Sequence, residues 1–179
     1  MGYKKHKQYR LKDFDYSSEG EYFVTICTAG RKHYFGKIED GKMFLSEIGK
    51  IADRMWNEIP NKFIGIKLDV YQIMPDHFHA ILIIKEPNMH LINQTPTKFK
   101  SGIKNNPMEL RSVTLGKIIR WFKGKVKYEV NKINRNFNWQ SRFHDRIIRD
   151  EKEFYFVSEY IINNPSNWEK DVLKKYFEM

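Results

Sequence analysis

The segment KLDVYQIMPDHFHAILII, residues 67–84, has the strongest strand pattern in this chain. It contains two runs rich in β-branched and aromatic residues, 67–74 and 77–84, and the pair Pro75-Asp76 separates them. Such runs, bounded by turn-forming residues, are typical of strands, so the segment predicts two successive strands. Both runs are apolar enough to predict a central position in a sheet.

The segments on either side predict further strands and helices. Each assignment rests on hydrophobic periodicity and on capping or turn residues at its ends. The predicted elements are, in chain order, a strand at 21–28, a hairpin turning at Asp40-Gly41, a helix from Ser46 that Pro60 ends, the two strands above, a helix within 112–134, a strand at 143–149 and a helix from Asp150 that Pro165 ends. With the hairpin set aside as an insertion, the order is β-α-β-β-α-β plus a last helix. This order predicts an α+β, ferredoxin-like (split βαβ) antiparallel sheet with helices on one face.

Two histidines open the second strand of the segment. Side chains alternate along a strand, so His77 and His79 point to one face and Phe78 points to the other, toward the core. Two imidazoles on one face can converge on one cation, and imidazole suits first-row transition metals better than a site made only of oxygen ligands does. The pair by itself also fits a polar strand face or two hydrogen-bonded histidines, and two ligands leave a metal shell incomplete.

The last predicted helix offers further polar groups. Tyr160 and Asn164 lie four residues apart on one side of it, next to a buried stripe of Phe154, Val157 and Ile161. A phenol is a poor nucleophile until something assists its deprotonation, and a neighbouring cation can do so. The amide oxygen of Asn164 can serve as a third, hard metal ligand. Read alone, Tyr160 also fits an ordinary tyrosine of an amphipathic helix.

Separate blocks of the sequence together resemble a known family. Residues 74–82, MPDHFHAIL, resemble the histidine signature of the single-tyrosine HUH transposases, in which two histidines flank a large apolar residue. Residues 139–149, WQSRFHDRIIR, and 159–165, EYIINNP, resemble the C-terminal block of the REP-associated tyrosine transposases. The blocks stand in the order that the family has, and the resemblance runs from about residue 21 to residue 165. Asn164, where insertion-sequence members have glutamine, favours the REP-associated branch.

The resemblance implies a metal-dependent single-stranded DNA endonuclease and strand transferase. It implies that His77, His79 and Asn164 hold Mg²⁺ or Mn²⁺ and that Tyr160 attacks the scissile phosphate, giving a 5′-phosphotyrosine link and a free 3′-hydroxyl. The implied substrate is single-stranded DNA with a hairpin or palindrome. The covalent link conserves the phosphodiester energy, and the sequence has no P-loop motif for ATP. Family members act as monomers or as homodimers, and the sequence leaves both open.

Positive charge gathers in two segments of the chain. Of 179 residues, 32 are Lys or Arg and 22 are Asp or Glu, so the formal net charge is +10, which favours a polyanionic partner. Residues 1–12 hold five basic residues and no acid. We therefore expect residues 1–20 to form a basic arm that contacts DNA through Lys4, Lys5 and Arg10. Residues 98–135 hold 11 basic and 2 acidic residues.

The second basic segment includes the predicted helix within 112–134. Its apolar residues follow helical spacing and predict a core stripe of Leu115, Ile118, Ile119, Phe122, Val126, Val130 and Ile133. The opposite side carries Lys117, Arg120, Trp121 and Lys127. Such a face can contact phosphates and stack on a base, although charged residues also form ordinary solvated faces.

Length and composition limit the number of domains and the class of protein. The length is that of one ordinary domain, so we expect residues 21–179 to form a single catalytic domain, with 85–111 as a long flexible loop inside it. The single cysteine, Cys27, excludes a disulfide within the chain and a cysteine-rich zinc module. The sequence shows no secretory signal and no apolar run long enough to span a bilayer. We expect a cytoplasmic, nucleoid-associated protein with no membrane partner.

Two other functions stay open at this point. A domesticated protein of the same fold that binds DNA or RNA without cutting it would share the fold and the charge, although all four site residues are present. A hydrolytic metalloenzyme, in which the histidine pair activates water, would leave Tyr160 and Asn164 without a role and would yield a free 5′-phosphate. Formation of a covalent protein–DNA adduct separates these functions.

Overall fold

An antiparallel sheet of four strands forms the centre of the protein. The computed structural model describes residues 19–85 and 113–170. The strands, in spatial order, are β4 (Ile66–Ile73), β5 (His77–Ile84), β1 (Gly20–Cys27) and β6 (His144–Ile148), and every neighbouring pair is antiparallel. Helices lie in the connections from β1 to β4 and from β5 to β6. This is the ferredoxin-like order, so the predicted fold class is confirmed.

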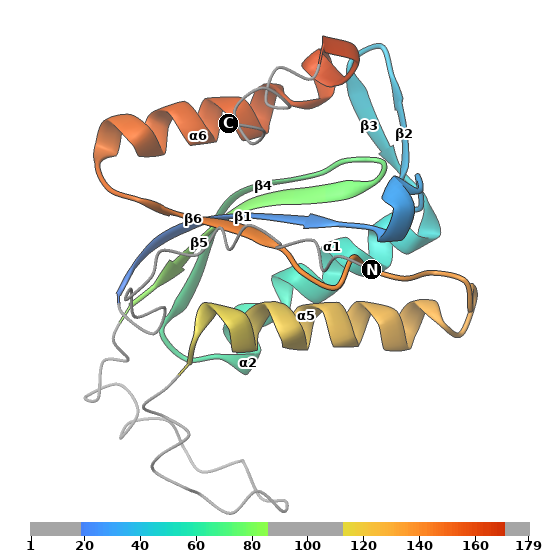
Figure 1. Cartoon of the computed structure of the whole chain (residues 1–179), viewed down its shortest axis with the longest axis horizontal. Helices are drawn as coiled ribbons and strands as arrows, with labels where there is room; N and C mark the ends of the chain where they lie inside the picture. Colours follow the sequence, from blue (N-terminus) through green and yellow to red (C-terminus); the bar gives the residue numbers. More distant parts are fainter. Residues whose placement is uncertain (1–18, 86–112, 171–179) are drawn as a thin grey trace, which may run out of the picture.

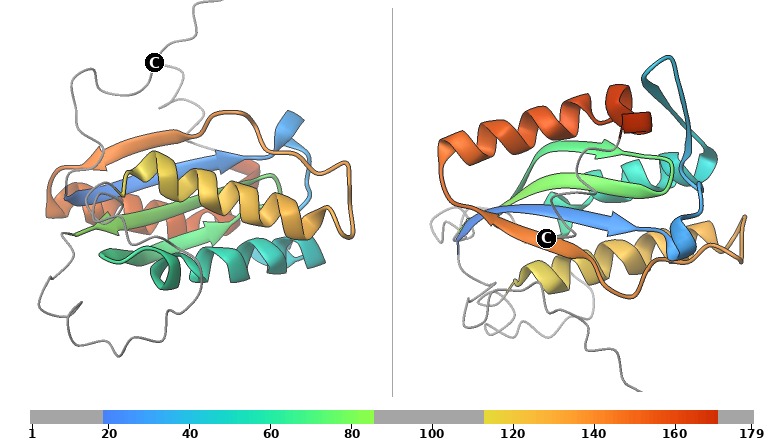
Figure 2. Two further views of the ribbon diagram at one scale, coloured as in Figure 1. Left: turned by 90° about the horizontal axis from the view of Figure 1, so that it is seen from below. Right: turned by 45° about the horizontal axis from the view of Figure 1, so that its top comes forward.

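The helices divide between the two faces of the sheet. α1 (Glu47–Asn57), α2 (Ile59–Lys62) and α5 (Leu115–Val130) cover one face, and α6 (Glu151–Asn163) crosses the other face by itself (Figure 1). Viewed from the side of α1 and α5, these two helices run next to each other across the sheet (Figure 2). The C-terminal helix is therefore separated from the other helices by the thickness of the sheet.

Capping residues start the three long helices. Ser46 caps α1, where its Oγ accepts a hydrogen bond from a backbone N–H of the first turn at 3.1 Å. Thr114 and Asp150 cap α5 and α6 in the same way. Each cap satisfies an N–H that the first helical turn leaves unpaired. Pro165 follows α6 and starts the short 3-10 helix η2 (Pro165–Lys170).

A two-stranded hairpin is inserted between β1 and α1. Its strands β2 (Gly36–Glu39) and β3 (Lys42–Leu45) meet at Asp40 and Gly41, whose φ angles are 50° and 69°. Positive φ at both central positions gives a tight turn that matches the right-handed twist of the strands, and the Asp-Gly pair favours it. A short 3-10 helix, η1 (Ala29–Arg31), lies between β1 and the hairpin.

The larger core lies between the sheet and the helices α1, α2 and α5. Phe78 of β5 packs there between Trp56 of α1 and Phe122 of α5, with ring centroids 4.6 and 5.6 Å away. Trp139, expected in the core, packs on Phe122 at 5.8 Å. A smaller apolar cluster lies between the sheet and α6, and its buried members are Phe23, Ile81, Ile83, Ile148, Val157 and Ile161.

The structure corrects three details of the prediction from sequence. α5 ends at Val130, so Ile133 lies beyond the helix and is 60% exposed instead of completing the core stripe. β4 is an edge strand and not a central one, and its exposed Lys67 suits an edge. Pro60 lies inside α2, because proline is tolerated in the first turn of a helix.

Two predicted segments lie outside the described residues. They are the basic arm up to residue 18, with Lys4, Lys5 and Arg10, and the predicted loop from residue 86 onward. Within the described part of the chain, no helix combines the length and the apolar character needed to cross a bilayer.

Candidate active site

Strand β5 sets the direction of the two histidines. A tight turn after β4 starts β5 at His77. Strand alternation then sends His77 and His79 to the α6 side of the sheet and Phe78 into the larger core, as the sequence predicts. The register between β5 and β1 places Thr25 directly opposite His79. The beginning of β5 and the end of β1 thus form one wall of the site.

The two imidazoles face each other through the same ring nitrogen. Nε2 of His77 and Nε2 of His79 are 2.9 Å apart. Both residues are buried, with 4% and 3% of their surfaces exposed. A neutral imidazole has one N–H and one lone pair, so two rings that carry their hydrogens on Nδ1 direct both lone pairs at the same point.

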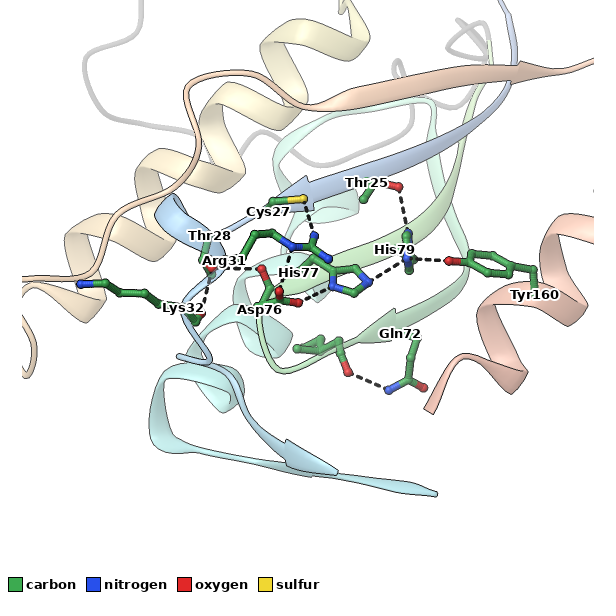
Figure 3. A network of polar contacts seen from close by, with 11 residues as sticks. Thr25, Cys27, Thr28, Arg31, Lys32, Gln72, Asp76, His77, His79 and Tyr160 are labelled. Atoms are coloured by element: carbon green, nitrogen blue, oxygen red, sulfur yellow. Dashed lines mark hydrogen bonds and ion pairs between the residues drawn. The ribbon is translucent and has the colours of Figure 1, made fainter. Parts of the chain in front are cut away.

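Each imidazole has a hydrogen-bond partner at its Nδ1, which fixes the orientation of the ring. For His77 the partner is Asp76, whose Oδ1 lies 2.6 Å from Nδ1. For His79 the partner is Thr25, whose Oγ1 lies 2.8 Å from Nδ1. Figure 3 shows both contacts on the opposite sides of the rings from the Nε2 pair. A carboxylate beside Nδ1 favours a hydrogen on that nitrogen and leaves Nε2 as the ligand, an arrangement common among metal-binding histidines.

Burial and nearby charge set the protonation of this cluster. Burial lowers the pKa of His79 well below its ordinary value, and the charges of His77 and Arg31 lower it further, so His79 is neutral at neutral pH. For Asp76, burial raises the pKa, but the His77 hydrogen bond and the charges of His77 and Arg31 outweigh it and lower the pKa. A neutral imidazole and an ionised carboxylate are the forms that a metal site requires.

Helix α6 brings Tyr160 to the histidine pair. The Tyr160 Oη lies 3.2 Å from Nε2 of His79, and the two rings meet edge to face with centroids 5.2 Å apart. Val157 and Ile161 on the buried side of α6 anchor the helix to the sheet. The phenol oxygen therefore continues the line of polar atoms that runs from Asp76 through both imidazoles (Figure 3).

Asn164 lies at the end of α6. It is the C-cap residue, one turn after Tyr160, and only 7% of its surface is exposed. The chain of polar contacts from Asp76 to Tyr160 does not include its side chain. The structure thus joins three of the four predicted site residues directly, and the role of Asn164 as a third ligand stays a prediction.

The donor set fits a divalent cation held by two imidazoles. Neighbouring ligands of an octahedral ion, each about 2.1 Å from it, lie about 3.0 Å apart. The Nε2 atoms of His77 and His79 have nearly this separation, 2.9 Å. Within residues 19–85 and 113–170, no group of three or more His, Cys, Asp or Glu side chains is placed to hold a metal ion. Among the described residues, further ligands would therefore be of another type, such as an amide oxygen or a phenol.

Three residues of the site were missed by reasoning from the sequence. Trp168 of η2 stacks on the His77 ring with centroids 5.9 Å apart and contacts His33 edge-on at 5.7 Å. Thr25 and Arg31 reach the site because β1 pairs with β5 and η1 follows β1. The sequence held one signal for this group, a threonine inside the otherwise apolar run of β1. No local pattern marks Arg31 or Trp168.

The predicted nucleic-acid face belongs to α5, which lies on the other side of the sheet from α6, the helix that carries Tyr160 (Figure 1). Lys117 and Arg120 are exposed there. Trp121 is half-buried and packs edge-on against another aromatic ring, and the amine of Lys127 donates to a backbone carbonyl after the helix. The structure does not bring these four side chains to the histidine pair, and their contact with nucleic acid stays a prediction.

The chain has a relative in sequence and neighbours in structure. No protein-family model matches it. An uncharacterized protein of Haemophilus influenzae (strain ATCC 51907 / DSM 11121 / KW20 / Rd) is 38% identical over 165 residues, which cover 92% of this chain and 90% of that protein. A REP-associated tyrosine transposase bound to a REP hairpin has a TM-score of 0.57 at 15% identity, covering 88% of this chain and 74% of that one. A candidate transposase of Deinococcus radiodurans has a TM-score of 0.44 at 14% identity, covering 86% and 97%.

These similarities carry different information. Identity of 38% over 92% of this chain shows membership of one family. Similarity of structure at 15% identity shows a shared fold, here the ferredoxin-like sheet with its helices. The chain therefore belongs to the family of the Haemophilus influenzae protein and has a transposase-like fold.

Proposed function

We propose that the protein is a metal-dependent single-stranded DNA endonuclease and strand transferase of the single-tyrosine HUH type. The observation that carries this proposal is the contact of 3.2 Å between Tyr160 Oη and Nε2 of His79, whose Nε2 faces that of His77 at 2.9 Å. Burial of polar groups has a desolvation cost that their pairing at best offsets. Apolar side chains at the same positions would stabilise the fold without this cost, so stability does not explain the cluster. Convergence of a nucleophile with two buried imidazoles favours a reactive site.

Tyr160 is the nucleophile in this proposal. The bond from its Oη to phosphorus forms as the bond from phosphorus to the 3′-oxygen of the preceding nucleotide breaks. The phenol proton leaves Oη, and the 3′-oxygen takes up a proton. The products are a 5′-phosphotyrosine and a free 3′-hydroxyl. Attack of a 3′-hydroxyl on the phosphotyrosine restores a phosphodiester, so rejoining needs no nucleotide hydrolysis.

The histidine pair would hold Mg²⁺ or Mn²⁺, with Asn164 as a further oxygen ligand. When bound, such an ion supplies Lewis-acid stabilisation of the charge on the phosphate oxygens. The chain itself provides orientation, since Asp76 and Thr25 hold the two rings through Nδ1 and α6 holds Tyr160 beside them. Groups that are oriented before the substrate arrives need little reorganisation during the reaction.

Charge and structural similarity support hairpin-bearing DNA as the substrate. The structural neighbour with a TM-score of 0.57 is a transposase bound to a REP hairpin. The net charge of +10 favours binding of a phosphate backbone. Lys117 and Arg120 on α5, together with the basic arm of residues 1–20, would hold DNA that extends beyond the site. Association with the nucleoid would follow from this binding.

One chain brings the nucleophile and the histidines together. Tyr160 meets His79 of the same chain, which supports a catalytic unit whose nucleophile and histidines come from one subunit. A homodimer whose subunits exchange α6 is the alternative arrangement. The mass of the active protein–DNA complex in solution distinguishes the two.

A covalent adduct tests the proposal. The full chain is incubated with Mn²⁺ and a pool of hairpin oligonucleotides that have randomised flanks and a label at the 3′ end. Denaturing electrophoresis should then show labelled protein. Tyr160→Phe should reduce this adduct by at least about 10³-fold. Tyr155→Phe is the matched control, because Tyr155 lies on the same helix and is 74% exposed, and it should form the adduct like the wild type.

The alternative functions give different products. An adduct that persists in Tyr160→Phe would show that the nucleophile is another residue. Cleavage with a free 5′-phosphate and no adduct would indicate hydrolysis by water. Binding without cleavage in either metal would indicate a DNA- or RNA-binding protein of the same fold. His77→Ala should remove the adduct while DNA affinity, which depends on charge, stays within a few-fold of the wild type.

A further inference from the structure

Arg31 has a backbone conformation that non-glycine residues rarely adopt. Its φ angle is 53°, and it follows Gly30, whose φ angle is 65°, in the short helix η1. The left-handed region is unfavourable for a residue with a Cβ, because the Cβ crowds the carbonyl oxygen that follows it. Such a conformation persists when the surrounding structure holds it, and it is found most often where a side chain must reach one particular place.

The strained turn directs the Arg31 guanidinium at the carboxylate behind the histidine pair. Nε of Arg31 lies 2.8 Å from Oδ2 of Asp76, and Nη1 donates to Sγ of Cys27 at 3.0 Å. The other carboxylate oxygen, Oδ1, lies 2.6 Å from Nδ1 of His77. One carboxylate oxygen of Asp76 therefore contacts Arg31 and the other contacts His77. Figure 3 shows Asp76 between these two side chains.

The two ends of this ion pair differ in burial. The side chain of Asp76 is 6% exposed, whereas that of Arg31 is 43% exposed. A buried carboxylate without its charged partner keeps its desolvation cost and is held in its orientation by fewer groups. Oδ1 of the same carboxylate orients His77. The removal of Arg31 would therefore also loosen the orientation of the His77 imidazole.

We propose that Arg31 is a positioning residue for the histidine pair. It fixes the Asp76 carboxylate, which keeps the hydrogen of His77 on Nδ1 and aims Nε2 at Nε2 of His79. The inference rests on the proposed function, in which these two nitrogens hold a divalent cation. It adds to the site a residue that lies outside the blocks of sequence that carry the family resemblance. A lysine would not replace Arg31, because one ammonium lacks the planar fork that reaches Oδ2 and Sγ together.

The tautomer of His77 is the first readout. Long-range ¹H–¹⁵N spectra of the full chain, recorded without metal and without DNA, show which ring nitrogen carries the hydrogen. The wild type should show the Nδ1–H form of His77, and Arg31→Gln should show a mixture of the two tautomers. Arg54→Gln is the matched control, because it removes the same charge from an exposed position on α1 across the sheet, and it should leave the spectrum unchanged.

The affinity for Mn²⁺ is the second readout. Removal of a residue that orients a metal ligand without touching the metal typically weakens metal binding by about 10- to 100-fold. Titration of Mn²⁺ followed by electron paramagnetic resonance should show a weakening of this size for Arg31→Gln and a smaller one for Arg31→Lys. Arg54→Gln should stay within twofold of the wild type, an allowance of about 0.4 kcal/mol.

A folded Arg31→Gln protein with the wild-type tautomer and the wild-type Mn²⁺ affinity would overturn the inference. The ion pair would then contribute to the structure alone. If circular dichroism shows that this variant is unfolded, Arg31→Lys decides, and wild-type values for both readouts would again overturn it. Neither readout needs DNA cleavage. A tautomer that depends on Arg31 in a protein that forms no adduct would contradict the proposed function and leave the inference standing.

Discussion

The two faces of the four-stranded sheet share their strands and bury different side chains. On the α1 and α5 face, β5 contributes Phe78 and alternate residues after it to an aromatic-rich apolar core. On the α6 face, the same strand contributes His77 and His79 at its beginning and Ile81 and Ile83 further along. The apolar part of the second face anchors α6, and the polar part meets the tyrosine that α6 carries.

The difference separates stability from chemistry within one sheet. Burial of large apolar side chains on the α1 and α5 face stabilises the fold by about 1.5–3 kcal/mol for each fully buried side chain. Burial of His77, His79 and Asp76 on the α6 face has a desolvation cost that their mutual hydrogen bonds must offset. We therefore expect substitutions on the two faces to have different consequences, although the residues are neighbours in sequence.

His79→Ala should produce the largest effect, and it should act on the chemistry. The rate of adduct formation should fall by at least about 10³-fold, because in the proposed mechanism one ring would supply both a ligand nitrogen and the contact to Tyr160. Single-turnover adduct formation with Mn²⁺ and hairpin DNA measures this rate. A variant that retains the wild-type rate would show that the reactive site lies elsewhere.

Phe78→Ala, one position away on the other face, should act on stability. The ring is fully buried between α1 and α5, and its removal should lower the free energy of unfolding by about 3–5 kcal/mol. Urea denaturation of the metal-free protein measures the change. The adduct rate per folded molecule should stay within a few-fold of the wild type, and a large fall in this rate would show that the two faces are coupled.

Thr25→Val should weaken metal binding with little change in shape. The substitution removes the hydroxyl that lies 2.8 Å from Nδ1 of His79, and Mn²⁺ affinity should fall by about 10- to 100-fold. Thr114→Val is the control on the opposite face, since it removes the cap of α5. The control should cost about 1 kcal/mol of unfolding free energy and leave the Mn²⁺ titration unchanged.

Replacement of both Lys117 and Arg120 by Gln should produce the smallest effect. Both residues are exposed on α5, so the change should weaken DNA binding by a few-fold. The slope of log affinity against log salt should become shallower by about 0.7 for each single-strand phosphate that the variant no longer neutralises. Fluorescence anisotropy at several salt concentrations measures both quantities. The adduct rate at saturating DNA should not change, and a change would show that the α5 face takes part in the chemistry.

Much of the fold could be predicted because its signals are local. The alternation around Phe78 assigned the histidines to one face, and Ser46 and Asp150 marked the starts of two helices. Strand order is not local, so the apolar run at 67–74 predicts a central strand, although β4 lies at the edge of the sheet. The apolar spacing predicts too long a helix for α5, because Ile133 continues that spacing beyond the last helical turn.

The features of the site also divide into those that local sequence predicts and those that depend on the folded chain. Periodicity along the chain is enough to predict that His77 and His79 share a face and that a helix carries Tyr160, because periodicity acts over a few residues. Two contacts become visible only in the folded chain: Tyr160 meets His79 from 81 residues away, and Thr25 contacts the same ring from 54 residues away. These contacts depend on strand order, on register and on the packing of α6, which no periodic pattern encodes over such separations.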